Sequence, residues 1–225
     1  MKKVALLLVS LAVSTTVSIS QAAQVRLDGK GYDVIYDDAL VGLFGQPILT
    51  GGSLVFNPTT FYALSSSDAW AFTNATLGLS IFADPGYTLA SVDLVERGDY
   101  LKFGGSATTF VSGQTRAYDF RTPTDETTSA ISGADATALS VHDGSTATNW
   151  EAKSSQSFAA GTTQAHLTIE SLFASHAGLG NLAFVENKYV ALTVSAVPEP
   201  RESLLLLAGL GLIGGLYRRR QNRIG

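Results

Sequence analysis

Histidine and carboxylate side chains are the groups in this sequence that could do acid–base or metal chemistry. His166 shares one face of a predicted strand with Thr168 and Glu170, since alternate residues of a strand point the same way. A His–Glu pair can hold a metal or relay a proton, but it also occurs as an ordinary surface contact. Zinc needs three or four converging ligands, and the sequence has neither an HExxH motif nor a His/Cys cluster.

Motifs for hydrolysis are missing as well. The segment GGSL at 51–54 is not followed by the second glycine of the GxSxG elbow that exposes a catalytic serine. A glycosidase needs two carboxylates that face each other across a cleft. Asp37-Asp38 and Asp125-Glu126 are instead chain neighbours in predicted turns. We therefore predict a protein that is not an enzyme and has no catalytic residues.

Calcium is the one cofactor that the residue pattern suits. Ca²⁺ binds several carboxylate and carbonyl oxygens in loops, and Asp33, Asp37 and Asp38 lie in or near predicted turns. These three residues are weak candidate ligands, because the DxDxDG run of a calcium loop is absent. No other cofactor is expected.

Tryptophan and tyrosine rings could bind sugars by stacking. Trp150 lies in a polar stretch, which predicts an exposed platform for a ligand. Trp70 alternates with Phe72 in an apolar stretch, which predicts a place in the core.

The elements that must position these residues are predicted to be β-strands. Short runs of alternating apolar and polar residues are separated by Gly, Pro and Asp turns about 8–12 residues apart. This pattern predicts an all-β fold, an antiparallel β-sandwich of jelly-roll or Ig-like type, over residues 23–196. Within it, 172–177 is expected to form one or two helical turns. The Ser/Thr-rich segment 122–164 is expected to form weak edge strands and long loops.

Composition excludes several classes of protein. The 225 residues include no cysteine, so disulfides and thiolate metal sites cannot form. The net charge is −4, and residues 23–197 alone hold eight Lys/Arg against seventeen Asp/Glu, a net charge of −9. An acidic surface of this kind stays soluble and avoids nucleic acid.

The two ends of the chain read as targeting segments. Residues 1–22 combine two lysines, an apolar run and a small-x-small site, which predicts a secretory signal peptide. Residues 197–225 begin with Val197-Pro198-Glu199-Pro200 and continue into a single predicted hydrophobic helix and a basic tail, which should stay cytoplasmic. The expected membrane anchor is Leu204, Leu205, Leu206, Leu207, Leu210, Leu212, Ile213 and Leu216, and the basic tail contains Arg218, Arg219, Arg220 and Arg223.

This order of Pro-Glu-Pro motif, apolar stretch and arginine run resembles the PEP-CTERM sorting signal. The resemblance implies export in a Gram-negative bacterium and recognition at Pro198, Glu199 and Pro200 by an exosortase, a membrane-embedded protease-transpeptidase. It implies an inner-membrane anchor at first, with the main domain in the periplasm, and a final place at the cell surface or in the extracellular matrix.

A second, looser resemblance covers residues 88–120, with an expected hairpin turn at Gly98-Asp99, and residues 178–194. These segments are similar to β-sandwich ectodomains that accompany this signal. The resulting hypothesis is a noncatalytic surface or matrix protein associated with exopolysaccharide. A carbohydrate-binding module with Trp150 or a tyrosine as its platform is the alternative, and an exported hydrolase ranks third.

Overall fold

The computed structural model describes residues 23–132, 147–199 and 210. The described part of the chain is almost entirely β-structure. Its strands are β1 (Gln24–Asp28), β2 (Tyr32–Asp37), β3 (Ile48–Thr50), β4 (Ser53–Phe56), β5 (Tyr62–Ser65), β6 (Ala69–Ala83), β7 (Tyr87–Phe103), β8 (Thr108–Asp119), β9 (Thr127–Ala130), β10 (Thr148–Ser157), β11 (Gln164–Ala177) and β12 (Leu182–Pro198). Two 3₁₀ turns, η1 (Asp38–Leu40) and η2 (Gly42–Phe44), join β2 to β3.

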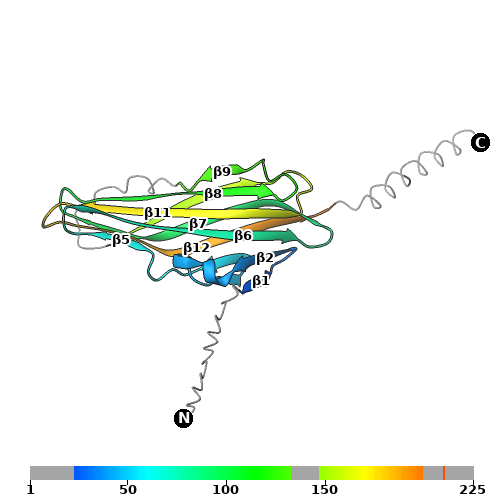
Figure 1. Ribbon diagram of the computed structural model, residues 1–225, viewed down its shortest axis with the longest axis horizontal. Helices are drawn as coiled ribbons and strands as arrows, with labels where there is room; N and C mark the ends of the chain where they lie inside the picture. The colour runs from blue at the N-terminus through cyan, green and yellow to red at the C-terminus, as the bar shows by residue number, and fades with distance from the viewer. Residues whose placement is uncertain (1–22, 133–146, 200–209, 211–225) are drawn as a thin grey trace, which may run out of the picture.

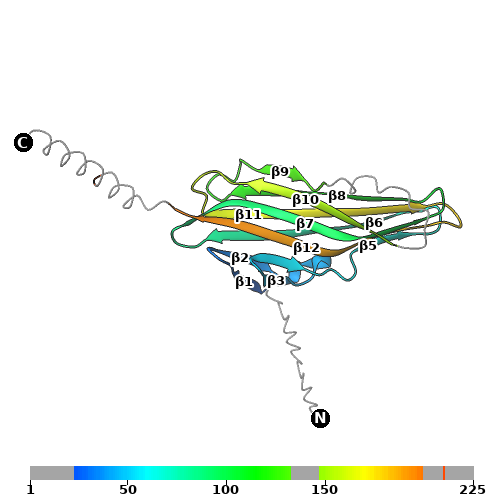
Figure 2. The same cartoon turned by 180° about the vertical axis from the view of Figure 1, so that it is seen from behind.

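The strands form two antiparallel sheets that lie face to face, with the long strands running along the molecule (Figure 1). The first sheet has the order β1-β2-β6-β11-β8-β9 and the second has the order β10-β7-β12-β4-β3, with β5 also paired to β12. Figure 2 shows the second sheet from behind, with β12 between β7 and the short strands β3 and β5. The predicted all-β antiparallel sandwich is therefore confirmed.

Alternation of apolar and polar residues explains why these segments form strands with one buried face. In β11, for example, every second residue points into the space between the sheets, namely Leu167, Ile169, Ser171 and Phe173, while the residues that alternate with them point outward. A chain of aromatic rings fills the middle of this core. Phe173 contacts Phe61 and Trp150, with ring centroids 4.5 Å and 5.6 Å apart.

Two local expectations are wrong. Residues 172–177 are the end of strand β11, not helical turns. Gly98 and Asp99 lie inside β7 and pair with β10 and β12, so no hairpin forms there. In both places the strand is held by long-range pairing on both sides, which local sequence does not reveal.

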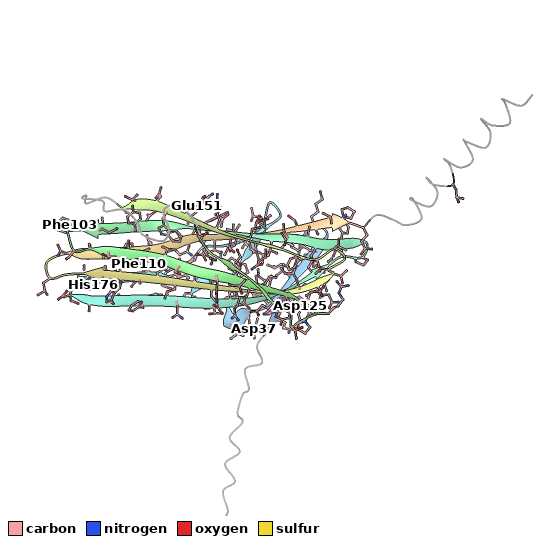
Figure 3. All side chains as sticks on the ribbon, turned by 90° about the horizontal axis from the view of Figure 1, so that it is seen from above. Asp37, Phe103, Phe110, Asp125, Glu151 and His176 are labelled. Carbon is pink, nitrogen blue, oxygen red and sulfur yellow. The ribbon has the colours of Figure 1, made fainter. Side chains whose placement is uncertain are left out.

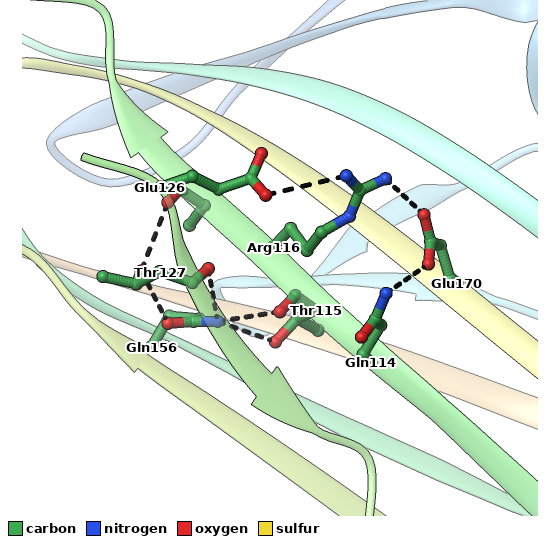
Figure 4. Close-up of polar contacts among 8 residues, drawn as sticks. Gln114, Thr115, Arg116, Glu126, Thr127, Gln156 and Glu170 are labelled. Carbon is green, nitrogen blue, oxygen red and sulfur yellow. Dashed lines mark hydrogen bonds and ion pairs between the residues drawn. The ribbon is translucent and has the colours of Figure 1, made fainter. Parts of the chain in front are cut away.

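The expectation of edge strands in 122–164 is confirmed for the described residues of that segment. β9 is the last strand of the first sheet, and β10 is the first strand of the second. The buried side chain of Gln156 in β10 makes the connection to the other sheet, as Figure 4 shows: its Nε2 donates to the Thr115 carbonyl (2.9 Å), and its Oε1 accepts from Thr127 Oγ1 (2.9 Å). β10 is thus tied to β8 and β9 across the sandwich.

Candidate aromatic binding face

Three large aromatic side chains gather on the outer face of the first sheet. Trp70 and Phe72 come from β6 and Phe110 from β8, and they are 49%, 64% and 36% exposed. β11 runs between those two strands and contributes His176, which lies opposite Trp70 in the register. We call these four residues the Trp70 cluster. Figure 3 shows Phe110 and His176 near the same end of the sandwich, far from Asp125.

Trp70 stands at the centre of this cluster. Its ring stacks on those of Phe72 and Phe110, with centroids 5.7 Å and 5.8 Å away and interplanar angles of 19° and 29°. The His176 ring lies 5.1 Å away. Ala174 of β11 is opposite both phenylalanines in the register, and its small side chain leaves the rings room to lie over the sheet. The result is a continuous aromatic surface facing solvent.

A polar hollow of about 410 Å³ follows the Trp70 cluster along the same face. Its walls come from the three strands β6, β8 and β11, and its lining includes Asn74, Thr76, Ser112, Gln114, Glu170 and Leu172. We call it the central hollow. It combines amide, hydroxyl and carboxylate groups with one exposed leucine, a mixture that can hydrogen-bond a ligand while packing against it.

Glu170 is the charged group of the central hollow. Gln114 Nε2 donates to Glu170 Oε2 (2.6 Å), and Arg116 donates to Glu170 Oε1, as Figure 4 shows. The hydrogen bond from Gln114, followed by that from Arg116, lowers the pKa of Glu170, so the carboxylate stays ionised near neutral pH. Arg116 also contacts Glu126 at 3.6 Å, which leaves its charge neutralised on two sides.

The predicted sharing of one face by His166, Thr168 and Glu170 is confirmed by β11. Glu170 nevertheless takes its hydrogen bonds from Gln114 and Arg116, while His166 packs on Tyr118 with ring centroids 5.2 Å apart. Burial lowers the pKa of His166, which favours its neutral form. In the described residues no group of three or more His, Asp or Glu side chains could hold a metal ion.

The burial of the two tryptophans is the reverse of what the sequence predicted. Trp150 is only 2% exposed, packs on Phe173 and donates its Nε1–H to the Glu186 carbonyl at 3.0 Å. It points inward from β10, so no sugar can stack on it, and the expectation of a ligand platform at Trp150 is wrong. Trp70, expected in the core, is the exposed residue.

Strand alternation explains the exchange. From Trp70 the outward face of β6 continues through Phe72, Asn74 and Thr76, whereas the inward face near the cluster carries small residues. In β10 the residues that follow Trp150 on the inward face are Ala152, Ser154 and Gln156. Because two of these buried residues are polar, the sequence pattern wrongly indicated that this face is exposed. Reading Asn74 and Thr76 as the continuation of the Trp70 face would have pointed to its exposure.

Two of the three candidate calcium ligands, Asp33 and Asp37, are engaged in local side-chain contacts. Asp33 lies in β2 and accepts a hydrogen bond from Arg26, forming an ion pair. Asp37 accepts a hydrogen bond from the Ala39 backbone N–H (3.0 Å) and so caps η1, the turn that begins at Asp38.

The predicted sorting motif begins at the end of β12. Val197 and Pro198 pair with β7, and the Glu199 N–H donates to the Gly86 carbonyl at 2.8 Å. These three residues are exposed. Leu210 is helical and exposed. In the described part of the chain, no helix is long and apolar enough to cross a membrane.

The remaining predicted targeting residues lie outside the described residues. They comprise the signal peptide 1–22, Pro200, Leu204, Leu205, Leu206, Leu207, Leu212, Ile213, Leu216, Arg218, Arg219, Arg220 and Arg223.

Comparison with known proteins gives no family for this chain. No protein-family model matches it, and no curated protein does. Among solved structures, one match is the structure of TmCBM61 in complex with β-1,4-galactotriose. It has 13% sequence identity and a TM-score of 0.19, over 80% of this chain and 90% of that chain. At this TM-score the two backbones do not superimpose, so nothing about the ligand of this chain follows from the match.

Proposed function

We propose that this chain is an exported, noncatalytic surface protein whose β-sandwich binds polysaccharide through the Trp70 cluster. The observation that carries the proposal is the stacking of exposed rings around Trp70 on one face of the first sheet. Sugar rings have apolar C–H faces that pack against aromatic rings, while their hydroxyl groups hydrogen-bond to polar side chains. A group of large apolar side chains left in water marks an interaction surface.

Affinity electrophoresis and tryptophan fluorescence test this proposal. The chain contains two tryptophans, and Trp150 is buried, so a ligand on the cluster should change the emission of Trp70. We expect at least one neutral polymer among β-glucan, galactan, galactomannan and xylan to retard the protein and change its fluorescence. Trp70→Ala should strongly reduce the retardation.

Phe103→Ala is the matched control for Trp70→Ala. Phe103 is also an exposed aromatic residue, but it ends β7 in the second sheet. This variant should bind like the unmodified protein. Equal retardation of the Trp70→Ala variant, or no retardation by any polymer in the panel, would contradict the proposed function.

The sandwich is proposed to be of the jelly-roll type. After β6, successive strands alternate between the two sheets, except for the β8–β9 pair. Ig-like sandwiches join several consecutive strands within one sheet, whereas jelly rolls wind the chain across two sheets. The alternation therefore supports the jelly-roll form of the two expected from the sequence.

Export and sorting through the C-terminal segment are proposed on the sequence motif. The exposure of Val197, Pro198 and Glu199 at the end of β12 supports access by an exosortase. The chain would be held first in the inner membrane and then released to the cell surface or matrix, where exopolysaccharide is its expected partner. Mass spectrometry of the native C-terminus should find an end near 198–203 in the secreted fraction. An intact terminus at Gly225 would contradict this route.

A further inference from the structure

A second aromatic cluster lies at the opposite end of the same outer face. It consists of Tyr118 of β8, His166 of β11, Phe82 of β6, and Phe120, which follows β8; we call it the Tyr118 cluster. The rings of Phe82 and Phe120 stack with centroids 6.1 Å apart and an interplanar angle of 14°. Tyr118 contacts both Phe120 (5.7 Å) and His166 (5.2 Å). Phe120 is 40% exposed.

The two clusters and the central hollow lie in one line. β11 runs through all three, from His176 in the Trp70 cluster, past Glu170 in the hollow, to His166 in the Tyr118 cluster. The ten residue-to-residue steps from His166 to His176 span about 33 Å at the rise of an antiparallel strand. β6 and β8 flank β11 on either side and supply the remaining groups of each part. Rings therefore lie at both ends of a polar middle.

We infer that this face binds a linear, uncharged polysaccharide lengthwise along β11, with sugar rings stacked on the clusters at both ends and hydroxyl groups hydrogen-bonded in the central hollow. The inference rests on the proposed function and adds the length and the charge of the ligand. An oligosaccharide that covers only one cluster uses half of the site, whereas a chain of several consecutive sugars can reach both.

The charges of the face favour a neutral polymer. Arg116 is the cation beside the hollow, and it is already paired with Glu170 and Glu126. The excess of seventeen Asp/Glu over eight Lys/Arg in residues 23–197 repels polyanions. Nucleic acid and acidic polysaccharides need unpaired cationic side chains to bind their negative charges, and Arg116 on this face is already paired.

The shape of the face separates a polysaccharide from an apolar partner. A membrane surface or a hydrophobic protein face needs a continuous apolar patch. Here the two clusters are separated by the polar side chains of Asn74, Gln114 and Glu170. An apolar partner would remove these side chains from water without offering new hydrogen bonds in return, which costs free energy. A hydroxyl-rich chain can offer those side chains new hydrogen bonds.

Chain-length dependence tests the inference. Binding of linear gluco-, galacto- and manno-oligosaccharides, from disaccharide to octasaccharide, would be measured by isothermal titration calorimetry with the unmodified protein. We expect the affinity for at least one series to rise with length and the octasaccharide to bind more than tenfold tighter than the trisaccharide, since it contacts both clusters. Alginate should bind more weakly than the neutral polymers.

Two variants separate this inference from the proposed function. Phe120→Ala and Trp70→Ala should each lower the octasaccharide affinity about tenfold, while Phe103→Ala should not change it and all three should keep their melting temperature. If Trp70→Ala lowers affinity but Phe120→Ala does not, or if the trisaccharide binds as tightly as the octasaccharide, two-ended binding is wrong and the proposed function stands. Preference for alginate would overturn the neutral ligand. No binding by any series would overturn both.

Discussion

Glu96 shows how a single buried residue shapes the properties of the whole sandwich. It points inward from β7 and is fully buried, and Ser171 of β11 donates a hydrogen bond to its Oε1 at 2.6 Å. Its other oxygen has no hydrogen-bond partner. Burial raises the pKa of Glu96 to about 7, although the hydrogen bond from Ser171 opposes the shift. The folded chain therefore holds a proton that the unfolded chain releases above its ordinary pKa of 4.5.

This raised pKa predicts a loss of stability as the pH rises. Between about pH 4.5 and 7 the folded state binds more protons than the unfolded state at this site, so the free energy of unfolding falls with pH. The loss is on the order of 3 kcal/mol for a shift of this size. Glu96→Gln cannot ionise, so we expect it to be more stable than the unmodified protein at pH 8 and similar to it at pH 4.

Urea denaturation across that pH range measures the effect. The difference in unfolding free energy between the two proteins isolates Glu96 from the other carboxylates. Glu199→Gln, which removes an exposed carboxylate at the end of β12, is the control and should leave the profile unchanged. Parallel pH profiles for the Glu96→Gln variant and the unmodified protein would show that Glu96 is not the titrating group.

At the scale of elements, β7 and β12 form the longest pairing in the second sheet, and one glycine permits their close contact. Gly98 of β7 lies opposite Asn187. A Cβ at this position would come within 1.8 Å of the Glu186 carbonyl oxygen and 2.8 Å of Trp150 Nε1. The absence of a side chain at Gly98 therefore leaves room for the hydrogen bond between Trp150 and Glu186.

Gly98→Ala should destabilise the protein by at least about 2 kcal/mol, because the strands must separate to admit a methyl group. Gly105→Ala is the matched control, since a Cβ there meets no atom within 4 Å and the backbone does not need a positive φ. Thermal melting followed by circular dichroism should show a large drop in melting temperature for the first variant and almost none for the second. Equal melting temperatures for the two variants would show that β7 and β12 do not approach too closely at Gly98 to admit a methyl group.

The aromatic face is also a property of elements rather than of neighbouring residues. Trp70 and Phe110 are forty positions apart in the sequence, and only the pairing of β11 with both β6 and β8 brings them together. The alternation of each strand can be predicted from the sequence, but the strand order cannot. The line of two clusters and a hollow could therefore not be recognised in advance.

At the scale of the whole molecule, the position of β12 predicts where the folded domain ends. β12 lies inside the second sheet, with β7 on one side and β4 and β5 on the other. Its residues Val190, Leu192 and Val194 are buried in the core. The pairing with β7 continues to Pro198, two residues into the segment expected to be the sorting signal.

Truncation tests this boundary. A chain of residues 23–199 should fold and melt cooperatively, since it contains every paired strand of the described residues. A chain of residues 23–189 loses the part of β12 that pairs with β4, together with four buried side chains, and should show no cooperative transition. Cooperative melting of the shorter chain would mean that the end of β12 is dispensable.

The sequence by itself determined the class of fold and the character of the domain. Period-two alternation, frequent turn residues and the lack of cysteine predicted an antiparallel sandwich that folds by core burial, and the Ser/Thr-rich segment correctly indicated edge strands. The signal peptide and the sorting signal stay predictions from the sequence. These features are local, so a single chain reveals them without knowledge of its contacts.

Only the tertiary structure decided which face of each strand is buried and which rings meet. Alternation divides the residues of β6 and β10 into two faces, but polar and large apolar residues share a face in both strands, so the local pattern around each tryptophan did not assign the face that the other sheet covers. Packing buried Trp150 against Phe173 and left Trp70 in solvent beside Phe72 and Phe110. The binding face depends on contacts between residues far apart in the sequence, and the order of the strands in the sheet sets those contacts.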